Sequence, residues 1–89
     1  MKTTDLIAKF REAGFTARCN WYAKKTDEKA VSVSEWFIYH DAHGLLTSCI
    51  VNEFDGGGLA VYWCNEKNDA DSDVVHLRAI IAQREAVEA

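Results

Sequence analysis

Apolar residues recur at helical spacing at the two ends of the chain and at strand spacing between them. Residues 4–13 are predicted to form an amphipathic helix, because apolar residues return every third or fourth position. These apolar positions are Leu6, Ile7, Phe10 and Ala13. A threonine at position 3 or 4 is expected to cap this helix, and Gly14 stands where a left-handed residue commonly ends one. A second helix is predicted over residues 74–88, with Arg84 among its solvated residues.

Four segments between the helices read as strands, and the first of them alternates cleanly between apolar and polar residues. They cover residues 15–22, 31–40, 45–54 and 59–64. Two turn signals, Asp41–Gly44 and Asp55–Gly58, separate the last three segments and predict antiparallel hairpins. Residues 1–89 are therefore predicted to form one α+β domain in the order α-β-β-β-β-α. We expect an antiparallel meander sheet with the two helices packed on one face.

The alternation also predicts which side chains share a face of the sheet. In the first strand, Trp21 is expected to point toward the first helix and Tyr22 away from it. In residues 31–40 the alternation ends at Glu35, and four apolar residues follow it. Either a β-bulge near Ser34–Glu35 exchanges the two faces, or the second half of this strand is covered on both sides. In residues 45–54, one face is expected to carry Leu46, Ile50 and Phe54, and the other Leu45, Cys49 and Val51.

Composition and charge limit the kinds of partner and the compartment that the chain is expected to have. The chain has 10 Lys and Arg residues against 14 Asp and Glu residues, a net charge of −4. This charge disfavours direct nucleic-acid binding, which needs a basic surface to neutralise phosphates, and it allows a basic partner protein. No segment approaches the ~20 apolar residues that span a bilayer, so no membrane partner is expected. The three cysteines are widely spaced without a CxxC pair, which predicts reduced thiols and a cytoplasmic protein.

Cysteine and histidine residues are the candidates for chemistry. His40, His43, Cys49 and Cys64 carry atoms that bind zinc, but their spacing matches no structural zinc pattern. Cys49 could act as a nucleophile with His40 or His76 as its base. Turn histidines and packed strand thiols explain the same residues, so we expect no catalytic residue, no metal and no cofactor. A small enzyme or metal-binding domain that uses Cys49, His40 and His43 is the alternative.

The aromatic residues favour a non-enzymatic interaction protein. The chain has three tryptophans and three tyrosines, residue types that are enriched at the centres of protein interfaces. Because two helices cover one face of a sheet, the other face is expected to expose aromatic side chains to a partner protein or to a second copy in a homodimer. The expected contacts are Tyr22, Trp36 and Tyr62, and Ile38 and Cys49 are further candidates for exposure.

An acidic segment between the last strand and the last helix is predicted to be a second contact. It carries Glu66, Asp69, Asp71 and Asp73. Clustered carboxylates can present a DNA-like pattern of charge to a basic groove. In size and charge, though in no motif, the chain is similar to phage-encoded inhibitors of host defence such as anti-CRISPR proteins. This similarity implies an inhibitor of a nucleic-acid-handling protein, and a solvated loop with helix-capping aspartates is the alternative.

Overall fold

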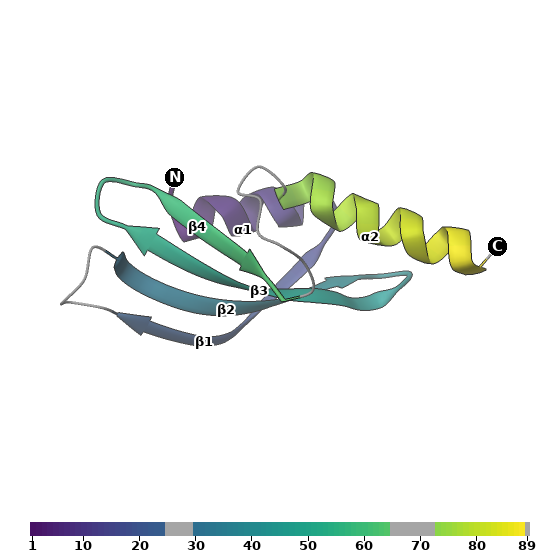
Figure 1. The fold of residues 1–89 in the computed structure, drawn as a ribbon, viewed down its shortest axis with the longest axis horizontal. Coiled ribbons are helices and arrows are strands. Elements are labelled where there is room, and N and C mark those ends of the chain that lie inside the picture. Colours follow the sequence, from purple (N-terminus) through teal and green to yellow (C-terminus); the bar gives the residue numbers. More distant parts are fainter. Residues whose placement is uncertain (25–29, 65–72, 89) are drawn as a thin grey trace.

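The computed structural model describes residues 1–24, 30–64 and 73–88, with the backbone alone for Asp73 and Glu88 (Figure 1). The elements are α1 (Thr3–Glu12), β1 (Thr16–Lys24), β2 (Ala30–His40), β3 (Gly44–Phe54), β4 (Leu59–Trp63) and α2 (Asp73–Glu88). The strands form one sheet in the order β1-β2-β3-β4, and every neighbouring pair is antiparallel. The predicted α+β class, element order and meander are confirmed.

The start of α1 is stabilised by carboxylates. Lys2 is the N-cap residue, and its main-chain N–H donates to the carboxylate of Asp5 (2.9 Å). The N–H of Thr3 donates to the carboxylate of Glu53 in β3 (2.7 Å). Carboxylates suit this position because the first N–H groups of a helix lack partners within it and form its positive end. The predicted threonine cap is therefore wrong, whereas Gly14 follows the helix with a φ of 95°, as expected.

Both helices lie on the same side of the sheet, which confirms the predicted packing (Figure 1). Together with the strands they enclose one hydrophobic core. Its members include Leu6, Ile7 and Phe10 of α1, Leu77 and Ile80 of α2, and Ala17, Ile38, Cys49, Val51 and Trp63 of the sheet. Burial of a large apolar side chain contributes roughly 1.5–3 kcal/mol, so the contact between the two layers is the main source of stability.

A β-bulge in β1 decides which aromatic residues face the helices. The pairing with β2 shifts between Cys19 and Trp21, which leaves Asn20 as an extra residue. One extra residue reverses the alternation of side chains beyond it. Trp21 therefore lies on the face away from the helices and Tyr22 on the helix side, the opposite of the predicted arrangement. The bulge predicted near Ser34–Glu35 of β2 is wrong, because β2 pairs with β3 without a shift from Ser32 to Ile38, and the extra residue lies in β1 instead.

A second bulge lies in β3, close to the turn that joins it to β2. The pairing with β2 leaves Leu46 without a partner. Leu46 is buried in the core as a result, whereas Leu45 before it is exposed. Beyond the bulge, Cys49 and Val51 point toward the helices and Ile50 away from them. The sequence predicted that Leu46 shares a face with Ile50, and Leu45 with Cys49 and Val51. This prediction is wrong for the two leucines, because Leu46 lies with Cys49 and Val51, and Leu45 with Ile50.

Arg84 of α2 connects the helix to the edge of the sheet. β4 pairs with β3 over Cys49–Glu53, so the first residues of β3 have no fourth strand beside them. The guanidinium group donates hydrogen bonds to the carbonyl oxygens of His43 (3.0 Å), Leu45 (2.9 Å) and Leu46 (3.4 Å). The prediction that Arg84 stays solvated is wrong, because carbonyl groups at an unpaired edge need a donor.

Candidate functional site

The sheet face away from the helices is the first candidate surface. Cross-strand pairing places Trp21, Glu35, Ile50 and Tyr62 in one row across the four strands. Trp21 is 41% exposed and Tyr62 is 45% exposed, so aromatic side chains stand at both edges of the sheet. Ile50, between them, is half-buried. Neither helix lies over this side (Figure 1).

Apolar side chains continue above and below this row. Phe37 and Tyr39 occupy the next two back-facing positions of β2, and both are half-buried. The guanidinium carbon of Arg18 lies 6.0 Å from the centre of the Tyr39 ring. We name the apolar residues of this surface the back face: Trp21, Val33, Phe37, Tyr39, Leu45, Ile50 and Tyr62. The back face is therefore an apolar sheet surface that no described helix covers.

The run of four apolar residues in β2 arises because both the helix side and the back face of this strand carry apolar side chains. Trp36 and Ile38 point toward the helices, and Phe37 and Tyr39 belong to the back face. The run does not reflect a strand covered on both sides, because the back-facing pair stays half-buried. Large uncovered apolar surfaces of this kind are commonly interaction sites.

One of the three aromatic residues predicted for this face is found there. Tyr62 lies on the back face, Trp36 packs against the hydrophobic core, and Tyr22 lies on the helix side beyond the bulge. Ile38 is 0% and Cys49 is 1% exposed, so the prediction that they could be exposed is wrong. Both belong to the core because they occupy positions of β2 and β3 whose side chains point toward the helices.

Sequence reasoning missed every member of the back face except Tyr62. Trp21 was assigned to the opposite face, since the alternation alone does not show the bulge at Asn20. Phe37 and Ile50 were not assigned to it because both strands carry apolar residues on two faces. The uninterrupted apolar run of β2 was the signal available for Phe37.

The predicted acidic contact falls largely outside the described residues. Glu66, Asp69 and Asp71 lie between β4 and α2, in the part of the chain that the structure does not describe. Asp73 is the first residue of α2. Their contact with a basic partner stays a prediction.

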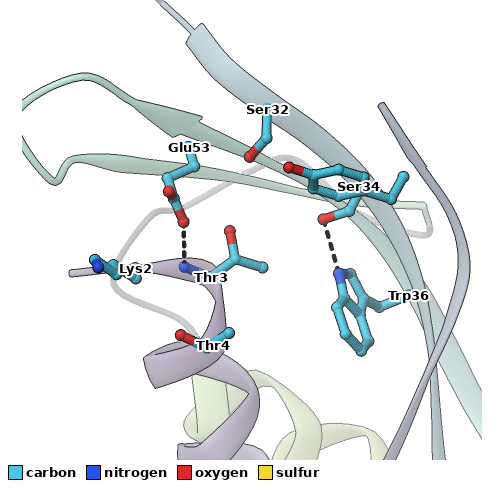
Figure 2. Close-up of a pocket in the computed structure, with 8 residues that line it drawn as sticks. Lys2, Thr3, Thr4, Ser32, Ser34, Trp36 and Glu53 are labelled. Atoms are coloured by element: carbon cyan, nitrogen blue, oxygen red, sulfur yellow. Dashed lines mark hydrogen bonds between the residues drawn. The ribbon is translucent and has the colours of Figure 1, made fainter. Parts of the chain in front are cut away.

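A pocket on the helix side is the second candidate surface. It has a volume of about 380 Å³ and lies between the first turn of α1 and the strands β1, β2 and β3 (Figure 2). Its lining residues are Lys2, Thr3, Thr4, Tyr22, Ser32, Ser34, Trp36 and Glu53. At 1.5 Å per helical residue α1 spans about 15 Å, whereas β2 spans about 36 Å. The helix is too short to cover the strand, and the pocket lies where the helix begins.

Hydrogen bonds hold two walls of this pocket in place. The indole N–H of Trp36 donates to the hydroxyl of Ser34 (2.8 Å), and the N–H of Thr3 donates to Glu53 (Figure 2). The hydroxyl of Thr3 is buried and has no partner among the described residues. Ser32 is 5% exposed, and within the described ranges its hydroxyl makes no hydrogen bond either. Buried polar groups normally have partners, so these two hydroxyls are available to a bound molecule.

Cys49, the candidate nucleophile, lies in the core. Burial, together with smaller contributions from the nearby Cys64 and Glu35, raises the pKa of its thiol to about 12. The thiolate is the reactive form of cysteine, so a thiol with this pKa is inert at neutral pH. These properties favour a packed core thiol. Among the described residues, no group of three or more His, Cys, Asp or Glu side chains is placed to hold a metal ion.

Cys64 has the opposite properties. It is exposed and directly follows β4. Its partial burial alone would raise the pKa of the thiol, but hydrogen bonds from Ser48 and Thr47 outweigh burial and hold this pKa below its usual value. The hydroxyl oxygen of Thr47 lies 3.4 Å from the sulfur. Of these two cysteines, Cys64 is therefore the reactive one.

The chain matches no protein-family model, no curated protein and no solved structure at a significant level. Neither helix in the described part of the chain has the length and apolar character needed to cross a membrane. Function must therefore be inferred from the surfaces of the molecule itself.

Proposed function

We propose that this protein is a non-enzymatic interaction protein whose back face binds another protein chain, either a partner protein or a second copy. The observation that carries this proposal is the row of Trp21, Ile50 and Tyr62 across a sheet face that neither helix covers. Tryptophan and tyrosine provide much of the binding energy of protein interfaces, because they bury a large area with few rotatable bonds.

The polar residues of the back face also suit an interface. Glu35, in the centre of the row, accepts a hydrogen bond from the side chain of Asn20 (2.6 Å). Arg18 lies beside the ring of Tyr39. Because these groups already have partners within the chain, covering them costs less than burying unpaired charges would.

An inhibitor of a nucleic-acid-handling protein is the more specific form of this proposal. Its support is the net charge of −4 and the four carboxylates within residues 66–73. A basic groove that binds phosphates would attract this segment. Replacing Asp69, Asp71 and Asp73 with lysine should then weaken binding to such a partner. Unchanged affinity would remove the segment from the interface and leave the back face as the contact.

A cytoplasmic location remains part of the proposal. Cys19, Cys49 and Cys64 are free thiols in the structure. Free exposed thiols are typical of reducing compartments, which supports this location.

Two neighbouring residues on opposite faces provide a matched test. A photo-crosslinking amino acid is introduced at position 21 or at position 22, and the protein is irradiated both in cells and as purified protein at micromolar concentration. Position 21 should form crosslinks to a partner or to a second copy, whereas position 22 should form few. Light scattering of the purified protein then separates a homodimer from a complex with another protein.

The same pair gives a test with ordinary substitutions. Trp21→Glu should abolish the association, because it replaces an aromatic member of the apolar contact with a charge, and Tyr22→Glu should preserve it. Circular dichroism verifies that both variants are folded. Equal effects of the two substitutions, or crosslinks from position 22 alone, would show that the back face is not the interface.

A further inference from the structure

The pocket at the start of α1 is a second site, independent of the back face. It lies on the helix side of the sheet, so a protein bound to the back face would leave it open. Two observations make it a candidate ligand site. The hydroxyl of Thr3 is buried without a partner, and Ser32 is 95% buried with its hydroxyl directed into the pocket (Figure 2).

The charges around the pocket select against charged ligands. The carboxylate of Glu53 forms one wall, and an anion in the pocket would be repelled by it. Lys2 and the positive end of α1 stand beside the same space and would repel a cation. A neutral ligand meets neither repulsion.

The hydrogen-bonding side chains of the pocket favour a ligand that carries hydroxyl groups. A hydroxyl group both donates and accepts hydrogen bonds, and the side chains of Thr3 and Ser32 offer both capacities. The free oxygen of Glu53 can accept a further hydrogen bond, because its other oxygen is bound to the N–H of Thr3. Trp36 and Tyr22 add aromatic surface for the apolar C–H groups of a ring. Polar groups and aromatic walls thus match the two kinds of surface of a sugar.

The size of the pocket limits the ligand to a small molecule. A volume of about 380 Å³ equals that of about a dozen water molecules at ~30 Å³ each. It is near the lower end of the range of ligand pockets, roughly 300–1,000 Å³. We propose that this pocket binds one neutral monosaccharide unit, held by the hydroxyls of Thr3 and Ser32 and by the carboxylate of Glu53.

Nuclear magnetic resonance provides a direct test with internal controls. The ¹⁵N-labelled protein is titrated with glucose, galactose, mannose and N-acetylglucosamine, and with the charged analogues glucosamine and glucuronate. The indole N–H signal of Trp36 should shift and saturate with at least one neutral sugar, with a dissociation constant on the order of millimolar. The indole signal of Trp21, on the back face, should not move. A methyl glycoside and a disaccharide of the bound sugar distinguish a free sugar from the terminal unit of a glycan.

Conservative substitutions then assign the contacts. Ser32→Ala and Thr3→Val each remove a hydroxyl with little change in volume, and each should weaken binding about three- to tenfold. Ser48→Ala removes a hydroxyl from the opposite face and should leave the affinity unchanged. The proposal is overturned if no neutral sugar shifts the Trp36 signal at concentrations on the order of tens of millimolar. It is equally overturned if a charged analogue binds more tightly, or if both hydroxyl variants keep the full affinity.

Discussion

Removal of the Arg84 guanidinium group should destabilise the protein more than a change at an exposed position of α2. The group donates to three carbonyl oxygens at the segment of β3 that β4 does not reach. Arg84→Met keeps the apolar stem of the side chain and removes its donors. The carbonyl groups of His43 and Leu45 then lose their charged partner, and the contact of His43 Nε2 with the carboxylate of Glu85 (3.4 Å) remains between α2 and this end of the sheet.

The size of the effect follows from the geometry. Hydrogen bonds from a charged donor contribute about 1.5–3 kcal/mol when both groups are buried, but Arg84 is half-buried, so we count about 1 kcal/mol for each of the two short ones. The third, at 3.4 Å, is too long to contribute much. The expected loss in the free energy of unfolding is thus about 2 kcal/mol. For a domain of this length this loss lowers the melting temperature by about 8–16 °C.

Urea unfolding followed by tryptophan fluorescence measures this loss. Arg78→Met is the matched control, because Arg78 is an exposed residue of the same helix, and its effect should stay within about 0.5 kcal/mol. Arg84→Lys should fall between the two, since an ammonium group cannot bond two carbonyl groups in the fixed fork of a guanidinium group. If Arg84→Met is no less stable than Arg78→Met, the three hydrogen bonds do not hold α2 to the sheet.

Two further predictions concern the cysteines. Cys64 should react with iodoacetamide faster than Cys49 at neutral pH. The pH at which Cys64 reacts at half its maximal rate should lie below the pKa of an ordinary thiol, and Thr47→Val should raise this pH. Mass spectrometry of the alkylated peptides measures both rates, and equal rates would contradict the assigned environments. For Cys49, whose pKa rises from 9.0 to about 12 on folding, unfolding exposes a thiol that ionises more easily. The free energy of unfolding should therefore fall as the pH rises above about 9, by up to about 1.4 kcal/mol per pH unit. Urea unfolding at alkaline pH should show a weaker pH dependence for Cys49→Ala, and an identical slope would refute the assignment.

The order of the elements could be predicted because it depends on local signals. Turns that begin with aspartate and end with glycine, Asp41–Gly44 and Asp55–Gly58, lie where the structure turns from one strand to the next. β4 is regular, and the predicted separation of Trp63 from Tyr62 onto opposite faces is confirmed. Where a strand pairs without interruption, the period of two in its sequence is enough to assign its faces.

The faces of β1 and β3 could not be predicted because they depend on pairing. Nothing in the residues around Asn20 or Leu46 distinguishes an extra residue from a paired one, since the bulge is a property of the register with β2. The pocket was missed for a related reason. Ser32 and Ser34 alternate with valines, a pattern typical of a strand with its serines in solvent. In the structure these serines are buried on the helix side and line the pocket at the start of α1.

The bulge at Asn20 links the two proposed surfaces. Without the extra residue, Trp21 would point toward the helices and Tyr22 would join the back face, so neither surface would have its present composition. With it, Trp21 completes the row with Ile50 and Tyr62, and Tyr22 becomes part of the pocket wall. β-bulges are enriched at sheet edges and beside functional sites, where they redirect a side chain. Substitutions at positions 21 and 22 therefore test different sites: position 21 tests association through the back face, and position 22 tests binding in the pocket. If one of these substitutions alone abolished both kinds of binding, the two sites would not be separate.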